Sequence, residues 1–238
     1  MPTPSPGIGG HVVGEAQTPS AADARFLSLR VAAEVYYDLQ QTRIGIVNRV
    51  ERGGIDAVFL TPTLERLQLA EHEAALVMRR TYRAAVDPRI VEWQRETTGV
   101  GEHLLARLLG TIGHPVETTV YAWQGEGAER VLVEVGQMRR SVSQLWSYCG
   151  HGDAKRQRAR GMSSEDAAAM GNPRAKMLVR LIAESCMKQR TSPYRAVYDE
   201  ARMDYESRDW TPLHRHNAAL RKVGKAMLKD LWLAGGGS

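Results

Sequence analysis

The sequence predicts a mainly α-helical protein that contains one small β-hairpin. Of its 238 residues 43% are hydrophobic, and only two are phenylalanine. Leucine, valine, alanine and methionine therefore carry most of the apolar mass, which favours packed helices over a β-sandwich. Apolar residues recur every three or four positions over long stretches, as on one side of a helix, and strict alternation is confined to one region.

The chain is expected to begin with a disordered arm and a long antiparallel helical hairpin. Residues 1–22 are rich in Pro, Gly, Ser and Ala, a composition typical of disorder. Two helices follow within residues 23–88, the first ending at Gly53-Gly54 and the second having Thr63 as its N-cap. Their apolar stripes are Leu29, Ala32, Tyr36, Leu39, Ile46 and Val50, then Leu60, Leu64, Leu67, Ala74, Met78 and Ala85. The short Gly-containing connection predicts that the helices are antiparallel.

The spacing of these stripes is close to a heptad repeat, which leaves two interpretations open. In the first, the two helices pack only against each other. In the second, the hairpin pairs with another copy of the chain or with a coiled coil on a partner. The residues expected to face such a partner are Tyr36, Leu39, Ile46, Leu67 and Met78.

Residues 89–234 are expected to form a second helical region with a β-hairpin insertion at 116–135. Alternating β-branched segments at 116–123 and 130–135 flank a Gly-containing turn. Helices are predicted at 90–96, 141–150, 164–171, 172–189, 192–204 and 216–234. Their buried residues are expected to include Met177, Leu178, Leu181, Ile182, Cys186, Leu220, Val223, Met227, Leu228 and Leu231. The last four residues, GGGS at 235–238, are typical of a flexible linker or a cloning scar.

Bulk properties limit the classes of protein to consider. The formal net charge is +5 and the isoelectric point is about 9.4, which permits nucleic-acid binding without requiring it. Two cysteines without a Cys/His cluster argue against a zinc site, and no cofactor or metal is expected. The first residues lack the pattern of a signal peptide, and no apolar run is long enough to span a bilayer. We therefore expect a cytoplasmic protein.

Gly99, Val100 and Gly101 lie directly before an amphipathic helix. In a helix-hairpin-helix turn, a Gly-x-Gly segment lets backbone N–H groups approach a DNA phosphate, and the next helix adds its positive N-terminal dipole. Such a contact would position the protein on DNA without reading its sequence. The alternative is a tight connection between two core helices.

A basic segment provides the second indication of nucleic-acid contact. Lys155, Arg156, Arg158 and Arg160 fall within a polar, Gly-flanked stretch, and such clusters release counterions from a phosphate backbone. The alternative is a solvated loop. Arg174, Lys176 and Arg180 follow in the next helix and extend the basic face.

Catalytic chemistry has few candidates in this sequence. A nucleophilic Ser or Cys needs an activating neighbour. Ser163 and Ser164 are the only serine pair in the basic part of the chain, but Glu165 and Asp166 follow them, as at a helix N-cap. Cys149 and His151 are close in sequence without forming a known catalytic pattern.

Several segments, taken in order, resemble transposases of the insertion-sequence 110 type, which are bridge-RNA-guided recombinases. These segments are YYDLQQTRIGIVNRVERGG, TTGVGEHLLARLLGTIG, SVSQLWSYCGHG, GNPRAKMLVRLIAESC, SPYRAVYDEAR and HNAALRKVGKAMLKDLW. The resemblance covers about Tyr36 to Leu233. It implies a coiled-coil region followed by a helical transposase-like domain with a helix-hairpin-helix-like turn.

The departures from that family are as informative as the matches. The RuvC-like DEDD domain of those transposases has no counterpart, and neither do its metal-binding carboxylates. The family's catalytic serine would fall near Gln157 or Arg158, where no serine stands. Ser163 or Ser164 would replace it only if the loop were realigned, and the β-hairpin is an insertion that the family usually lacks.

These observations predict a non-catalytic accessory protein of DNA recombination. The leading hypothesis is a phage recombination directionality factor that binds a serine integrase and switches it toward excision. The resemblance thus implies a bacterial or phage-infected host cell. Two alternatives stay open: a DNA-binding protein that acts alone, and an active transposase that uses Ser163 or Ser164. Double-stranded DNA, contacted directly or through the recombinase, and a homo-oligomer are further expected partners.

Overall fold

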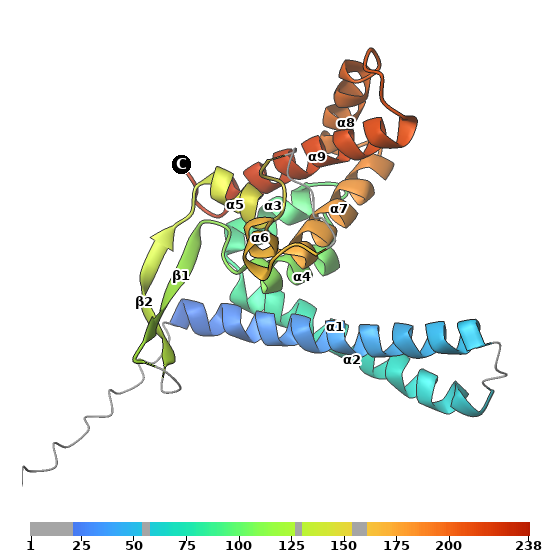
Figure 1. Ribbon diagram of the computed structural model, residues 1–238, viewed down its shortest axis with the longest axis vertical. Helices are drawn as coiled ribbons and strands as arrows, with labels where there is room; N and C mark the ends of the chain where they lie inside the picture. Colours follow the sequence, from blue (N-terminus) through green and yellow to red (C-terminus); the bar gives the residue numbers. More distant parts are fainter. Residues whose placement is uncertain (1–20, 54–57, 127–129, 154–160) are drawn as a thin grey trace, which may run out of the picture.

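The computed structural model confirms a mainly helical protein with one small antiparallel sheet (Figure 1). The structure describes residues 21–53, 58–126, 130–153 and 161–238. Its first helices are α1 (Ala21–Gly53) and α2 (Thr61–Ala85), preceded by the 3-10 turn η1 (Val58–Leu60). The next two are α3 (Pro88–Glu96) and α4 (Glu102–Ile112). After strands β1 (Glu117–Gln124) and β2 (Val131–Arg139) come α5 (Val142–Tyr148), α6 (Ser164–Ala169), α7 (Pro173–Lys188), α8 (Pro193–Asp204) and α9 (Pro212–Ala234).

Helices α1 and α2 run side by side in opposite directions and project beyond the rest of the molecule (Figure 1). Leu29, Ala33 and Tyr36 of α1 belong to the same hydrophobic core as the buried residues of α4, α7 and α9. The predicted N-cap Thr63 is wrong, because α2 begins at Thr61 with Pro62 in its first turn. Proline suits that position, since the N–H that it lacks would have no partner within the helix.

Capping residues explain where the C-terminal helices begin. Ser141 and Gln144 form a reciprocal capping box at the start of α5. Asn172, Ser192 and Thr211 each accept a backbone N–H at the start of α7, α8 and α9, and each is followed by proline. Helix α9 thus begins four residues before the predicted 216, because Thr211 and Pro212 supply a better start signal.

The rotation of α7 differs from the sequence prediction. Leu178, Ile182 and Cys186 are fully buried as expected, but Met177 is 40% exposed and Leu181 is 37% exposed. Small residues, Ala175 and Ala183, take the buried positions on the other flank of the stripe. In α9 the prediction is confirmed, because Leu220, Val223, Met227, Leu228 and Leu231 are all buried.

The two strands form a hairpin that extends from the helical body (Figure 1). Glu117 pairs with Arg139 at its base and Gln124 with Val131 near its tip, so β2 continues past the predicted end at 135. Val120 pairs with Gly136 and Tyr121 with Glu134, so Val135 is the extra residue of a bulge in β2. The C-terminal residues that were expected to form a free linker contact this base, since Arg139 donates to the carbonyl of Gly236 (2.7 Å). Gly237 N in turn donates to Trp232 O of α9 (3.0 Å).

The turn between α3 and α4 shows why glycine stands at position 99. Gly99 has φ of +97°, in the left-handed region that favours glycine. A Cβ at this position would lie 2.6 Å from the Cα of Cys186 in α7, which is too close for any side chain. The turn therefore brings its backbone directly against α7.

Replacing Gly99 by alanine should destabilise the protein by about 2–4 kcal/mol, because backbone strain and a clash with the α7 backbone add. Gly101→Ala is the matched control: a Cβ there meets nothing within 4 Å, and its φ of −75° is ordinary. We expect it to cost less than about 1 kcal/mol, as for glycine at an N-cap. Urea unfolding of both variants measures the difference, and equal stabilities would contradict this account of the turn.

Candidate nucleic-acid interface

The exposed sides of α7 and α9 enclose a groove with a cationic rim. The cavity has a volume of about 430 Å³. It is lined by His151, Pro173, Lys176, Met177, Arg180, Asn217, Leu220 and Arg221. The outward rotation of α7 places Met177 here, so the groove has an apolar floor and a charged edge.

Few carboxylates neutralise the cations of this groove. Arg180 pairs with Glu184 at 2.9 Å. Arg221 donates to the carbonyl oxygens of Gly150 (3.3 Å) and Gly152 (2.9 Å) and interacts electrostatically with Asp153. In the described part of the chain no ion pair joins Lys176 to an acidic residue.

Lys225 extends the cationic rim along α9. Its Nζ lies 4.0 Å from the ring centroid of Trp146, whose indole N–H donates to the Lys225 carbonyl. Burial, and then the charge of Arg221, lower the pKa of Lys225. The two cations are therefore close enough to repel each other, and an anion in the groove would relieve that repulsion.

His151 lies at the inner end of this groove and is neutral. Its side chain is buried, and Nδ1 donates to the carbonyl of Cys149 at 2.8 Å. Burial lowers the pKa of His151 to about 4; the hydrogen bond to Cys149 opposes this, and the charges of Arg221, Lys176 and Lys225 add to it. Three cations thus surround one uncharged imidazole.

The structure separates the two predicted regions of DNA contact. The Gly99–Gly101 turn touches Cys186 near the C-terminal end of α7, whereas Arg174 and Lys176 are in its first turn. At 1.5 Å per residue, Arg174 and Cys186 lie about 18 Å apart along the helix. One short patch of DNA backbone therefore cannot touch both regions in the same way.

Gly99, Val100 and Gly101 form a packing joint in this structure. Val100 is buried and its backbone N–H donates to Thr97 O (3.1 Å), so this N–H, which was predicted to approach a phosphate, is used within the protein. Gly101 is exposed, but the next residue, Glu102, places a carboxylate at the N-terminus of α4. That carboxylate accepts from Arg83 at 2.6 and 2.8 Å. It occupies the electrostatic position that a phosphate would take at a helix N-terminus.

The predicted basic residues have different fates. Lys176 belongs to the groove. Arg174 points to the helix pair. Its guanidinium lies 3.7 Å from the Tyr37 ring centroid and donates to Ala33 O (3.3 Å). Its predicted contact with nucleic acid is therefore corrected to a contact within the protein. Lys155, Arg156, Arg158 and Arg160 lie outside the described residues.

Among the candidate nucleophiles, the Ser163 hydroxyl is hydrogen-bonded within the protein and the two cysteine thiols are protonated. The Ser163 hydroxyl donates to the Asp166 carboxylate (2.7 Å) and accepts the Asp166 backbone N–H (3.0 Å), which is the geometry of an N-cap. The side chain of Ser164 lies outside the described part. Burial raises the pKa of the Cys149 thiol to about 12 and that of Cys186 to about 11, so both stay protonated at neutral pH.

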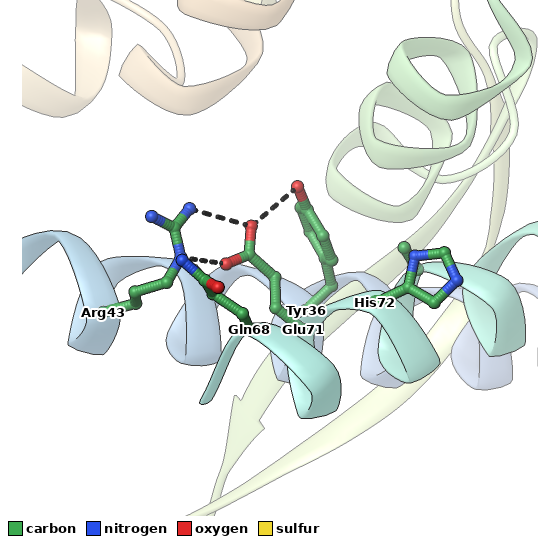
Figure 2. Close-up of a pocket in the computed structure, with 6 residues that line it drawn as sticks. Tyr36, Arg43, Gln68, Glu71 and His72 are labelled. Atoms are coloured by element: carbon green, nitrogen blue, oxygen red, sulfur yellow. Dashed lines mark hydrogen bonds and ion pairs between the residues drawn. The ribbon is translucent and has the colours of Figure 1, made fainter. Parts of the chain in front are cut away.

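A second cavity, of about 400 Å³, lies between α1 and α2 (Figure 2). Glu71 is its centre: it accepts from Arg43 at 2.6 Å and from the Tyr36 hydroxyl at 3.4 Å, as the dashed lines in Figure 2 show. The hydrogen bond from Arg43 lowers the pKa of Glu71, with burial opposing it. The carboxylate of Glu71 neutralises the charge of Arg43 within the protein. This polar cavity therefore attracts an anion less strongly than the α7–α9 groove does.

The residues predicted to face a partner lie largely inside the helix pair. Met78 is fully buried and Tyr36 is 6% exposed, so the prediction that these two contact a partner is wrong. Leu39, Ile46 and Leu67 are half-buried on the same helices. The apolar stripes with heptad-like spacing therefore pack within the protein.

The comparisons with known proteins add no relative. No protein-family model matches the chain, and no curated protein or solved structure matches it. Among residues 21–53, 58–126, 130–153 and 161–238, no three His, Cys, Asp or Glu side chains gather as a metal site. In the same part of the chain, no helix has both the length and the apolar character needed to cross a membrane.

Sequence reasoning missed Arg221 and Lys225. Their spacing of four residues was visible, and it places both on one side of a helix. Charged residues on an amphipathic helix usually mark only a solvated side, so this signal had no specificity. What identifies the groove is the approach of α7, a segment about 45 residues earlier in the chain.

The buried neutral His151 makes stability depend on pH. Between pH 6.5 and about 4 the unfolded imidazole binds a proton that the folded one does not, so stability is full above 6.5 and is lost as pH falls toward 4. His151→Asn should reduce that loss by up to about 3 kcal/mol. Urea unfolding across this pH range measures it, with exposed His72→Asn as control. If His151→Asn and His72→Asn both lose stability with falling pH as the parent chain does, His151 is not the cause of the loss.

Proposed function

We propose that the protein binds the phosphate backbone of nucleic acid, first of all duplex DNA, in the α7–α9 groove. The observation that carries this proposal is the gathering of four cations, Lys176, Arg180, Arg221 and Lys225, in and beside the groove. Among the described residues, Glu184 pairs with Arg180 and Asp153 interacts with Arg221. Lys176 and Lys225 make no ion pair with a described residue, and cations of this kind are the usual means of neutralising phosphates.

The distribution of charge supports the same conclusion. Residues 171–238 carry 13 Lys and Arg against seven Asp and Glu, so this part of the chain is more basic than the whole. A basic surface concentrated on a few helices is typical of proteins that track a phosphate backbone. Backbone binding of this kind is independent of base sequence.

The proposed role is that of a non-catalytic accessory protein in DNA recombination. The resemblance to transposases of the insertion-sequence 110 type motivates the recombination context. The hydroxyl of Ser163 caps α6, and the two thiols are held protonated by burial. A covalent protein–DNA link needs an activated nucleophile, so we assign no covalent step to these residues.

Binding of duplex DNA should weaken steeply with salt, and removing groove cations should flatten that dependence. In Lys176→Gln/Lys225→Gln, two lost phosphate contacts should lower the slope of log affinity against log salt by about 2. Fluorescence anisotropy with two unrelated duplexes measures this. Lys188→Gln, at the other end of α7, is the matched control. Equal salt slopes in the double variant and the control would refute the groove as the binding site.

A second candidate function rests on exposed apolar side chains of the helix pair. Leu27, Val31 and Val35 follow one another every four residues on α1 and are 52%, 51% and 48% exposed. Val77 of α2 is 52% exposed. Such a row along one side of a helix is suited to another helix. It supports the recombination directionality factor hypothesis, in which the partner is a serine integrase.

Pull-down with a serine integrase, with and without attachment-site DNA, tests this second function. Val31→Gln/Val35→Gln should reduce capture at least about tenfold, because hydrophobic contact in the interface is lost. Exposed Gln41→Ala on the same helix should leave capture unchanged. Absence of capture by the unmodified chain in both conditions would end this hypothesis without affecting the groove.

A further inference from the structure

Three aromatic side chains gather at the turn between α8 and α9. The rings of Trp210 and His214 are stacked, with centroids 4.1 Å apart and an interplanar angle of 7°. Tyr205 lies 5.2 Å from Trp210 at a tilt of 45°. Figure 1 shows that α8 and the start of α9 project from the body of the protein, so the cluster is at a protruding end.

This cluster is not part of the hydrophobic core. Neither Tyr205 nor Trp210 is among the partly buried residues that pack against the core, although Trp93, Trp146 and Trp232 are. Two apolar neighbours, Met203 and Leu213, are 67% and 66% exposed. A tryptophan contributes most to stability when it is buried. Trp210 is half-buried at a turn whose neighbouring residues are exposed, so core packing does not explain why tryptophan stands there.

Two cations lie over the aromatic rings, and they differ in their acidic partners. Lys222 lies 5.1 Å from the Tyr205 ring centroid and pairs with Asp204 (2.8 Å). The guanidinium of Arg208 lies 4.7 Å from the Trp210 ring centroid and 5.0 Å from that of Tyr205. Arg208 is exposed and makes no ion pair with any described residue. A flat, exposed guanidinium on an indole marks a position where another flat group can stack.

The cluster lies in line with the α7–α9 groove. His214, Arg221 and Lys225 are separated by seven and four residues, which places them on one side of α9. At 1.5 Å per residue, His214 is about 10 Å along the helix from Arg221. This is about the span of one or two nucleotides in an extended strand. A backbone held in the groove thus brings a neighbouring base to Trp210.

We propose that Trp210, with Tyr205 and His214, is a stacking platform for an unpaired nucleobase. The inference rests on the proposed function, because the groove must hold the phosphates. The base displaces the Arg208 guanidinium from the indole, and Arg208 then lies free to meet the adjacent phosphate. Stacking on aromatic rings accepts every base, so the platform favours single strands, gaps and junctions over intact duplex without reading sequence.

Anisotropy with three labelled probes tests the platform: an oligothymidine of about 16 nucleotides, a matched duplex and the same duplex with a short gap. The parent chain should bind the gapped and single-stranded probes about tenfold more tightly than the duplex. Trp210→Ala should abolish this preference and leave duplex affinity unchanged. Trp210→Phe should restore part of it, because phenylalanine keeps a flat ring.

Leu213→Ala is the matched control, since it removes an exposed apolar side chain from the same turn without removing a ring. It should behave like the parent chain. Oligothymidine should also quench tryptophan fluorescence in the parent chain and not in Trp210→Phe, which isolates Trp210 from the other tryptophans.

The outcomes separate the two proposals. Equal affinity for all three probes, or a preference that persists in Trp210→Ala, overturns the stacking platform. In that case, salt-dependent binding of the duplex would still support the groove as the phosphate-binding site. Absence of salt-dependent binding to every probe overturns the groove and the platform together. Unchanged thermal unfolding of Trp210→Ala is expected, because Trp210 does not pack against the core.

Discussion

The close packing of α7 against its neighbours is the constraint on which the rest of this structure depends. At one end of α7, Gly99 leaves no room between the α3–α4 turn and Cys186. In its middle, a Cβ on Gly224 of α9 would lie 2.8 Å from both Val179 and the His151 ring. At its N-terminal end, Arg174 reaches α1 and stacks on Tyr37. These three close contacts fix both the position and the rotation of α7.

This rotation determines which chemistry reaches the surface. The small residues Ala175 and Ala183 face inward, and Lys176, Met177 and Arg180 face outward beside α9. The close approach of Gly224 also helps to bury His151, and the neutral imidazole adds no fifth positive charge to the four cations of the groove. The interior and the charged surface are thus two sides of one packing arrangement.

Much of the fold was predictable because local signals agree with tertiary packing. The buried stripe of α9 and the cap at Ser141 can be read from spacing and residue type alone. The groove and the platform could not, because they depend on which flank of an apolar stripe turns inward. In α7 leucine and methionine occupy both flanks, and only contact with α4 and α9 decides that Leu178 is buried and Met177 is not. Arg174 was equally undecidable, since a surface arginine and one that stacks on a distant tyrosine have the same sequence context.

The attachment of the helix pair has a mechanical consequence. Arg174 holds α1 at Tyr37, and a chain of hydrogen bonds from Arg107 through Gln40 to Glu71 joins α4 to both helices nearby. Beyond that point α1 continues to Gly53, which is about 24 Å at 1.5 Å per residue. The outer half of the pair is therefore a lever: a tilt of about 5° at its base moves its tip by about 2 Å, by the same helix geometry. A few polar side chains around Tyr37 set where the far end of the molecule points.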